Sequence, residues 1–303
     1  MTRIIFMGTP DYAASILEAL IDADDIEVVS VYTQPDKPVG RKAILTPPIV
    51  KVVAEKANIP VIQPLKLRDE AIVAEVVATP CDMIIVAAYG QILPKAILEY
   101  VPCVNLHASI LPHYRGASPI QQSLLNNDSQ SGVTAMWMDE GLDTGAIIKI
   151  ESLAIADDEM VESLYERLTH TAVDLTLDVI RHWDRTSAEK QNDAEASQCK
   201  KILKSDGLID FSDAREIYNR YRAYTPWPGL YLESGLKIKS MKLEEESSSA
   251  EAGKILAVDK ESIVVQCTLG SLRIFRVQAP SKQETSVIDY LNGKRIGCGH
   301  SLV

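Results

Sequence analysis

The chain has 303 residues, of which 46% are apolar, and a formal net charge of -11 at pH 7. This length exceeds the usual size of a single hydrophobic core, so two domains are expected. No stretch approaches the roughly 18 uninterrupted apolar residues of a membrane helix, and the five cysteines are scattered without a Cys-x-x-Cys pair, which argues against a disulfide framework or a zinc site. We therefore expect a metal-free, soluble protein of the reducing cytoplasm that has no membrane partner.

The first half of the chain alternates strand patterns with helix patterns. Strands are expected at residues 3–7, 26–32, 83–87 and 101–106, and helices at residues 11–22, 49–57 and 67–78. This alternation predicts the α/β fold class, with a Rossmann-like, mostly parallel sheet covered by helices on both faces. Ligands of such sheets bind at the carboxyl ends of the strands.

The glycine loop after the first strand is Gly8-Thr9-Pro10-Asp11-Tyr12-Ala13. It lacks the Gly-x-Gly-x-x-Gly spacing that lets a main chain approach a pyrophosphate. A nicotinamide cofactor is therefore not expected.

The pattern changes after a helical periodicity that ends near Trp183. Residues 184–198 are polar and lack large apolar side chains, which is typical of a linker, and lysines make the following residues basic. A short helix is expected at residues 214–224, with short strands near residues 231, 237–241, 254–258, 262–268 and 271–277, and a solvated hairpin tip at residues 244–249. These strands predict a small, OB-like C-terminal β-barrel. The expected division is a catalytic domain at 1–183, a linker at 184–206 and a second domain at 207–303.

The negative charge is distributed unevenly along the chain. Residues 206–303 contain 13 Lys and Arg against 13 Asp and Glu, so residues 1–205 hold all of the excess negative charge. Such an asymmetry permits nucleic-acid contact through the neutral C-terminal part but does not demonstrate it.

Three polar residue types are expected to converge at the end of the strand near residue 106. Asn105 and His107 lie two residues apart, on one face of an extended chain, and a glycine-flanked loop can bring Asp143 to them. An amide, an imidazole and a carboxylate can hold an oxyanion and manage a proton, which suits transfer of an activated acyl group to an amine. A histidine at a strand end is also common as a satisfied core or turn residue, and spacing alone leaves both interpretations open.

Several sequence blocks resemble the methionyl-tRNA formyltransferase family. They are residues 6–13, 33–38 with Gly40-Arg41, 105–119 with Gln121, 138–145, and the C-terminal segment Tyr224-Thr225-Pro226-Trp227-Pro228-Gly229. The Asn-x-His and Ser-x-Leu-Pro core is shared by all 10-formyltetrahydrofolate-dependent formyltransferases. The Thr-Gln-Pro-Asp block and the C-terminal segment point to the tRNA enzyme.

The resemblance implies a reaction and a set of site residues. The formyl group of 10-formyltetrahydrofolate would pass to the α-amine of charged initiator methionyl-tRNA, for translation initiation, with Asn105, His107 and Asp143 as catalytic residues. The loops that would bind the folate co-substrate contain Ala88, Tyr89, Gly90, Gln91, Ser109, Ile110, Leu111, Pro112, Asp139, Glu140, Gly141 and Leu142. For these loops, ordinary turn chemistry is the competing interpretation.

Basic residues near the expected site suggest where tRNA could bind. Arg41 and Lys42 lie in a connection longer than the roughly 2 to 6 residues usual between a strand and a helix, and such a loop can contact phosphates or bases, unless it is simply a solvated surface loop. Lys200, Lys201 and Lys204 form a second basic cluster. We expect these five residues to bind nucleic acid and the chain to act as a monomer.

Two departures from the family pattern bear on tRNA contact. His113-Tyr114 replaces a commoner Arg-aromatic pair, and residues 43–45 are apolar where the family is often more basic. Three alternative functions remain at this point. They are a formyltransferase acting on a sugar amine or glycinamide ribonucleotide, a formyltetrahydrofolate hydrolase, and a non-catalytic folate or RNA binding module.

Overall fold

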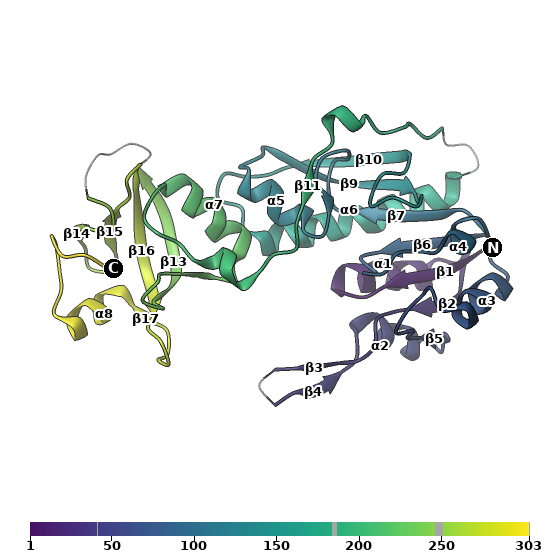
Figure 1. Cartoon of the computed structure of the whole chain (residues 1–303), viewed down its shortest axis with the longest axis horizontal. Coiled ribbons are helices and arrows are strands. Elements are labelled where there is room, and N and C mark those ends of the chain that lie inside the picture. The colour runs from purple at the N-terminus through teal and green to yellow at the C-terminus, as the bar shows by residue number, and fades with distance from the viewer. Residues whose placement is uncertain (41, 184–186, 246–250, 303) are drawn as a thin grey trace. The chain divides into compact units, whose positions relative to one another are not determined.

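The computed structural model describes residues 1–40, 42–183, 187–245 and 251–302. Within them the chain forms two compact units (Figure 1). Unit 1 comprises Met1–Pro119, Gln130–Ala154 and Tyr165–Cys199, and unit 2 comprises Ile120–Ser129, Ile155–Leu164 and the chain from Lys200 onward.

Unit 1 is built on a sheet with the strand order β10-β9-β7-β6-β1-β2-β5 among the described residues. The bounds are β1 Thr2–Gly8, β2 Ile26–Tyr32, β5 Val61–Ile62, β6 Met83–Ala87, β7 Cys103–His107, β9 Gln130–Trp137 and β10 Ile147–Ala154. The pairs from β7 through β6, β1 and β2 to β5 are parallel, whereas β9 is antiparallel to both β7 and β10. The prediction of a mostly parallel sheet in the N-terminal domain is confirmed.

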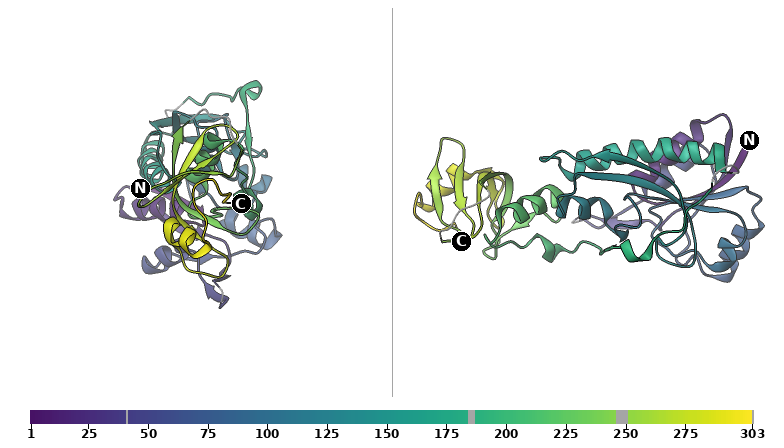
Figure 2. Two further views of the ribbon diagram at one scale, coloured as in Figure 1. Left: turned by 90° about the vertical axis from the view of Figure 1, so that its left-hand side faces the viewer. Right: turned by 90° about the horizontal axis from the view of Figure 1, so that it is seen from above.

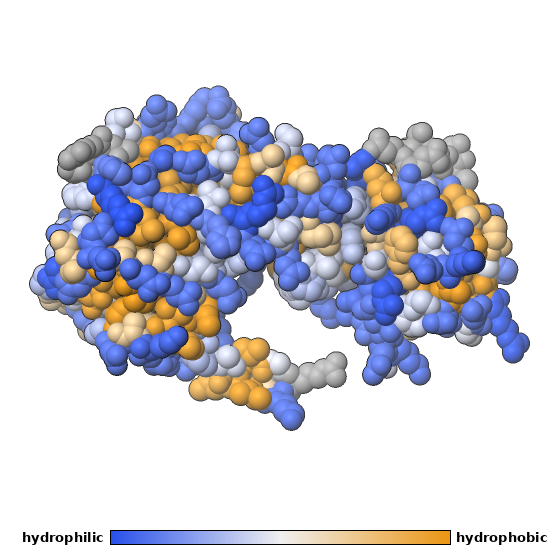
Figure 3. Space-filling model, turned by 180° about the vertical axis from the view of Figure 1, so that it is seen from behind, coloured by the Kyte–Doolittle hydropathy of each residue, from blue (hydrophilic) through white to orange (hydrophobic). Residues whose placement is uncertain are grey.

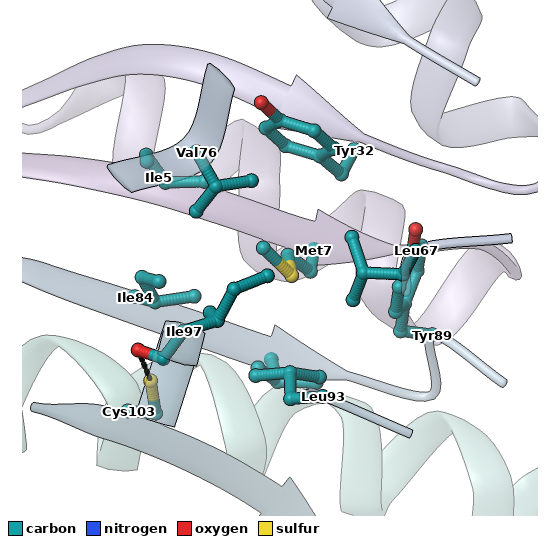
Figure 4. Packing of buried hydrophobic residues seen from close by; sticks show 11 residues of the cluster. Ile5, Met7, Tyr32, Leu67, Val76, Ile84, Tyr89, Leu93, Ile97 and Cys103 are labelled. Carbon is teal, nitrogen blue, oxygen red and sulfur yellow. Dashed lines mark hydrogen bonds between the residues drawn. The ribbon is translucent and has the colours of Figure 1, made fainter. Parts of the chain in front are cut away.

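Helices cover both faces of this sheet. They are α1 Asp11–Asp22, α2 Ile49–Lys56, α3 Glu70–Ala78, α4 Lys95–Leu98 and the long α6 Val161–His182. Tyr12 of α1 and Tyr165 of α6 meet edge to face, with ring centroids 6.3 Å apart. The long α6 runs along one side of the sheet (Figure 2). Val76 of α3 and Ile97 of α4 pack on the other side, against a buried cluster that includes Met7 (Figure 4). Because both faces are covered, β6 and residues 4–7 of β1 are continuously apolar instead of alternating.

Two short pairings complete unit 1. A small antiparallel hairpin, β3 Lys37–Val39 and β4 Ile44–Thr46, projects after β2. The second pairing joins β8 Arg115–Gly116 in parallel to β11 Gln198–Cys199. The polar segment expected as a linker therefore contacts unit 1 as far as residue 199.

Unit 2 contains an antiparallel sheet with the order β12-β13-β16-β15-β14, and β17 pairs with β16. Its elements are α5 Pro119–Leu125, the 3₁₀ helix η3 Lys204–Gly207, α7 Ala214–Tyr224, β12 Leu230–Tyr231, β13 Lys237–Glu245, β14 Ile255–Val258, β15 Ile263–Gln266, β16 Ser271–Gln278, β17 Thr285–Ser286 and α8 Val287–Lys294. The expected C-terminal antiparallel β domain is confirmed. Part of the expected hairpin tip, residues 246–249, lies outside the described residues.

A buried arginine holds helices together inside unit 2. Arg222 of α7 is 1% exposed and donates to Asn127 Oδ1 at 2.7 Å and to Asn219 Oδ1 at 2.8 Å. The same guanidinium donates to the Leu124 carbonyl at 3.4 Å, near the end of α5. Burial lowers the pKa of Arg222, which shows that the charge is costly there and that these oxygens offset the cost.

Candidate active site

Strand β7 carries two of the three expected catalytic side chains. Asn105 and His107 are both buried and share one face, since side chains alternate along a strand. Asp143 comes from the loop between β9 and β10. That loop begins beside Cys103, whose carbonyl accepts from Met138 N at 2.8 Å, and then doubles back along β7.

The structure brings the three side chains together. Asn105 Nδ2 donates to Asp143 Oδ1 at 3.3 Å, and His107 Nδ1 lies 3.7 Å from Asp143 Oδ2. The main-chain N–H of Gly116 donates to the same Oδ2 at 2.8 Å. The His107 and Asp143 side chains are only 7% and 11% exposed, so water screens their interaction weakly.

The main-chain contact of His107 fixes the roles of its two ring nitrogens. Nε2 lies 2.9 Å from the Tyr114 carbonyl oxygen, which only accepts, so Nε2 carries hydrogen. Nδ1 consequently faces Asp143 and can accept a proton on that side. Asn105 uses one amide hydrogen on Asp143 and, within the described part of the chain, its second N–H has no acceptor.

The loop that carries Asp143 depends on its glycines and on Asp139. Asp139 Oδ1 accepts from Gly141 N at 2.9 Å and from Thr144 Oγ1 at 2.6 Å, which closes the turn. A Cβ on Gly145 would lie 1.7 Å from the Trp137 carbonyl oxygen, so only glycine fits there. Asp143 itself has φ 55°, a left-handed conformation that surrounding contacts must hold.

The loop after β6 presents main chain to solvent. Ala88 and Gly90 are exposed, with φ of 46° and 81°, whereas the Tyr89 ring is buried. The Gln91 side chain is used internally, on Leu67 N at 2.7 Å and the Pro64 carbonyl at 3.1 Å. This side chain therefore shapes the loop from within.

The Ser109–Pro112 turn is also held from within. Ser109 Oγ donates to the His113 carbonyl at 2.6 Å, while Thr134 Oγ1 bridges Leu111 N and the Ser109 carbonyl. Ser109 and Leu111 are buried, and the Leu111-Pro112 peptide is cis. In the Asp143 loop, by contrast, Leu142 is 65% exposed, and Glu140 pairs with Lys95 at the surface.

The expected nucleic-acid-binding residues have different surroundings. Arg41 lies outside the described residues, and Lys42 is exposed in the turn after β3. The hairpin around it has apolar side chains at its surface, Val39, Ile44 and Leu45, which are 55%, 62% and 64% exposed (Figure 3). The lysines of the second cluster are exposed as well, namely Lys200, Lys201 and Lys204.

Gln191 is a site residue that the sequence patterns missed. It is buried within the segment expected as a linker, and its Nε2 donates to the Asp143 carbonyl at 2.9 Å. No local pattern signals this burial, because the neighbouring residues 192–195 are all exposed.

Within the described ranges, no group of three or more His, Cys, Asp or Glu side chains is placed to hold a metal ion. A search of the same residues finds no helix that could span a membrane.

Comparison with known proteins relates both halves of the chain to one family. The family model "Formyl transferase" matches residues 2–180, and "Formyl transferase, C-terminal domain" matches residues 201–295. The chain is 56% identical to the methionyl-tRNA formyltransferase of Sulfurimonas denitrificans over 300 residues, covering 99% of each chain. It is 49% identical to the methionyl-tRNA formyltransferase of Wolinella succinogenes over 304 residues, covering 100% of each.

Solved structures share the fold at lower identity. An N-formyltransferase from Helicobacter canadensis, in complex with folinic acid and dTDP-3-aminofucose, has a TM-score of 0.70 at 21% identity, covering 92% of this chain and 100% of that one. HypX from Aquifex aeolicus, in complex with tetrahydrofolic acid, has a TM-score of 0.62 at 15% identity, covering 98% of this chain and 48% of that one. The much higher full-length identity to the tRNA enzymes disfavours the sugar-amine alternative. This chain therefore belongs to the methionyl-tRNA formyltransferase family and is a formyl-transferring enzyme.

Proposed function

We propose that the chain transfers the formyl group of 10-formyltetrahydrofolate to the α-amine of initiator methionyl-tRNA, with Asn105, His107 and Asp143 as its catalytic residues. One observation carries the assignment of residues. The Asn105 amide and the His107 imidazole both approach the nearly buried Asp143 carboxylate. Relatives that match the whole chain, and the folate compounds named in the neighbouring structures, support the choice of substrates.

The chemistry is an acyl transfer without a covalent enzyme intermediate. The α-amine has an ordinary pKa of about 8, so a useful neutral fraction is present at pH 7. Its nitrogen attacks the formyl carbon, and the carbonyl electrons move to oxygen. The tetrahedral oxyanion then collapses, breaking the bond to the folate nitrogen, which leaves with a proton.

The geometry suggests a division of work among the three side chains. The unused N–H of Asn105 donates to the oxyanion. His107 accepts the amine proton at Nδ1, since Nε2 is engaged by the Tyr114 carbonyl. Asp143 balances the resulting positive charge from 3.7 Å away and keeps the imidazole in place.

The folate site is proposed in the loops beside this trio. The exposed main chain of Ala88 and Gly90 supports this proposal, because free N–H and C=O groups can pair with the edge of a pterin. The buried Ser109 side chain and the partly buried Gln91 side chain would keep the loop shapes, while exposed Leu142 would offer an apolar contact.

The tRNA site is proposed at two groups of basic residues. One is Lys42 on the β3–β4 hairpin with Arg41, its neighbour in sequence, and the other is Lys200, Lys201 and Lys204 at the start of the C-terminal region. The four lysines among them are exposed to solvent, which supports the proposal that they contact tRNA. We assign catalysis to residues 1–183, a connecting role to 184–206 and tRNA binding to 207–303. We further propose that the enzyme is cytoplasmic and acts as a monomer. One chain supplies all three proposed catalytic side chains, so a second subunit is not needed to complete the site.

The direct test is a formyl-transfer assay with 10-formyltetrahydrofolate and charged initiator tRNA. Parallel reactions contain uncharged tRNA, a nucleotide-sugar amine, or water as the only acceptor. We expect N-formylmethionyl-tRNA in the first reaction alone. Faster formylation of the sugar amine, or equally fast release of formate to water, would contradict the proposal.

A further inference from the structure

The side-chain amide of Gln191 makes four hydrogen bonds to oxygen and nitrogen atoms beside the proposed catalytic carboxylate, and its Nε2 also lies 3.8 Å from Met136 Sδ. Its Nε2 donates to the carbonyls of Asp143 at 2.9 Å and Gly145 at 2.8 Å. Its Oε1 accepts from Nε and from a terminal nitrogen of Arg115, at 2.9 and 2.8 Å. Both hydrogens and both lone pairs of the amide are thus used, in a side chain that is 5% exposed.

These contacts fix the orientation of the amide. A flipped amide would place its oxygen against two carbonyl oxygens and its NH₂ group against a guanidinium, which only donates. Arg115 is itself buried and is held on its outer side by Asp193 at 2.9 Å. Gln191 is therefore a rigid connection between the Asp143 loop and strand β8.

The connection closes a ring around Asp143. Arg115 is followed directly by Gly116, whose N–H donates to Asp143 Oδ2 at 2.8 Å. The Asp143 carbonyl accepts a hydrogen bond from Gln191, whose side chain also binds Arg115. The Asp143 carboxylate accepts a hydrogen bond from Gly116, the residue after Arg115. A non-glycine residue at φ 55° keeps this backbone conformation only where several contacts hold it, and these hydrogen bonds hold Asp143 at both ends.

We propose that Gln191 is a positioning residue for the formyl-transfer reaction, setting the Asp143 carboxylate against Asn105 and His107. The inference rests on the catalytic role proposed for Asp143. It assigns a function in the active site to a side chain from the polar segment between the two family domains.

The test replaces Gln191 by Met and by Glu in the full-length enzyme. Met keeps the approximate length but removes every polar contact, while Glu keeps an acceptor for Arg115 and removes both donors to the loop. Gln198→Met is the matched control, because Gln198 is exposed and lies in the same segment.

A misplaced catalytic group costs turnover more than substrate binding. We expect kcat to fall by about 10- to 100-fold in Gln191→Met and at least as much in Gln191→Glu. KM for both substrates should stay within about threefold of wild type. Gln198→Met should match wild type. If Gln191→Met melts below the assay temperature, Gln191→Glu supplies the same comparison.

A double-mutant cycle with Asp143→Asn separates positioning from general stability. If Gln191 acts through Asp143, Gln191→Met should have little further effect on kcat in the Asp143→Asn background. An undiminished effect there, or an unchanged kcat in both Gln191 variants, would overturn this inference alone. Wild-type turnover by Asp143→Asn itself would instead overturn the catalytic role of Asp143.

Discussion

The Asn105 amide offers the sharpest test of the proposed chemistry, because its contribution to catalysis exceeds its contribution to stability. In Asn105→Ala, Asp143 loses one hydrogen bond of 3.3 Å but keeps the bond from Gly116 N at 2.8 Å. The free energy of unfolding should therefore fall by about 1 kcal/mol, which a domain with roughly 5–15 kcal/mol of stability tolerates. Loss of one oxyanion donor should lower kcat by about 100- to 1,000-fold, or about 2.7–4 kcal/mol.

The assay compares kcat for formylation of charged initiator tRNA with the thermal unfolding of each variant. Asn292→Ala, which truncates an exposed asparagine on α8, is the control and should behave as wild type in both measurements. A folded Asn105→Ala enzyme that retains wild-type kcat would refute the assignment of Asn105 as oxyanion donor. If the activity of Asn105→Ala falls only in proportion to the fraction of folded protein, the assignment of Asn105 as oxyanion donor is refuted as well.

Two further expectations concern stability and tRNA binding. Arg222→Met should lower the free energy of unfolding by about 2–3 kcal/mol, because buried oxygens such as Asn219 Oδ1 lose their donor. Denaturant unfolding measures it, and Lys294→Met on exposed surface of α8 should change little. Arg41→Ala and Lys42→Ala should each weaken tRNA binding and reduce its salt slope by up to about one unit if the side chain contacts a phosphate. Relaxed initiator preference with an unchanged slope would instead indicate a base contact, and unchanged affinity, slope and preference would exclude contact.

The elements that could be predicted from the sequence are those in which the buried residues recur in a regular pattern. Strands β2 and β6 and helix α7 have the expected bounds, because continuous apolar runs or a 3.6-residue period extend over their whole length. The β3–β4 hairpin was expected only as a long loop. Its strands are exposed on both faces and, among the residues that the structure describes, pair with no other strand, so no burial pattern marks them.

The candidate site was predictable to the extent that it lies on one strand. Asn105 and His107 had to share a face, because both belong to β7. The approach of Asp143 depends on a left-handed residue and on a loop that doubles back, and spacing does not determine either. The burial of Gln191 depends on Arg115, which is 76 positions away in sequence. Spacing and resemblance to a family therefore suggested Asn105, His107 and Asp143 as candidates, whereas the contacts of Gln191 with the Asp143 loop are seen only in the structure.

The Cys199 thiol lies next to the proposed site, and its surroundings argue against its use as a covalent nucleophile. Its Sγ donates to the Tyr114 carbonyl at 3.2 Å, the oxygen that also accepts from His107. Burial raises the pKa of the Cys199 thiol, so the nucleophilic thiolate is scarce at neutral pH. Covalent catalysis by this thiol is therefore disfavoured, which agrees with the proposal that the substrate amine is the nucleophile. In Cys199→Ser, a hydroxyl replaces the thiol as the donor to the Tyr114 carbonyl, and we expect kcat to stay within about tenfold of wild type. If Cys199 were a covalent nucleophile, the same substitution would lower kcat by several orders of magnitude. Alkylation at neutral pH should modify exposed Cys298 first and leave formyl transfer intact. A folded Cys199→Ser enzyme without activity, or trapping of a formyl thioester on this residue, would show that the noncovalent mechanism is wrong.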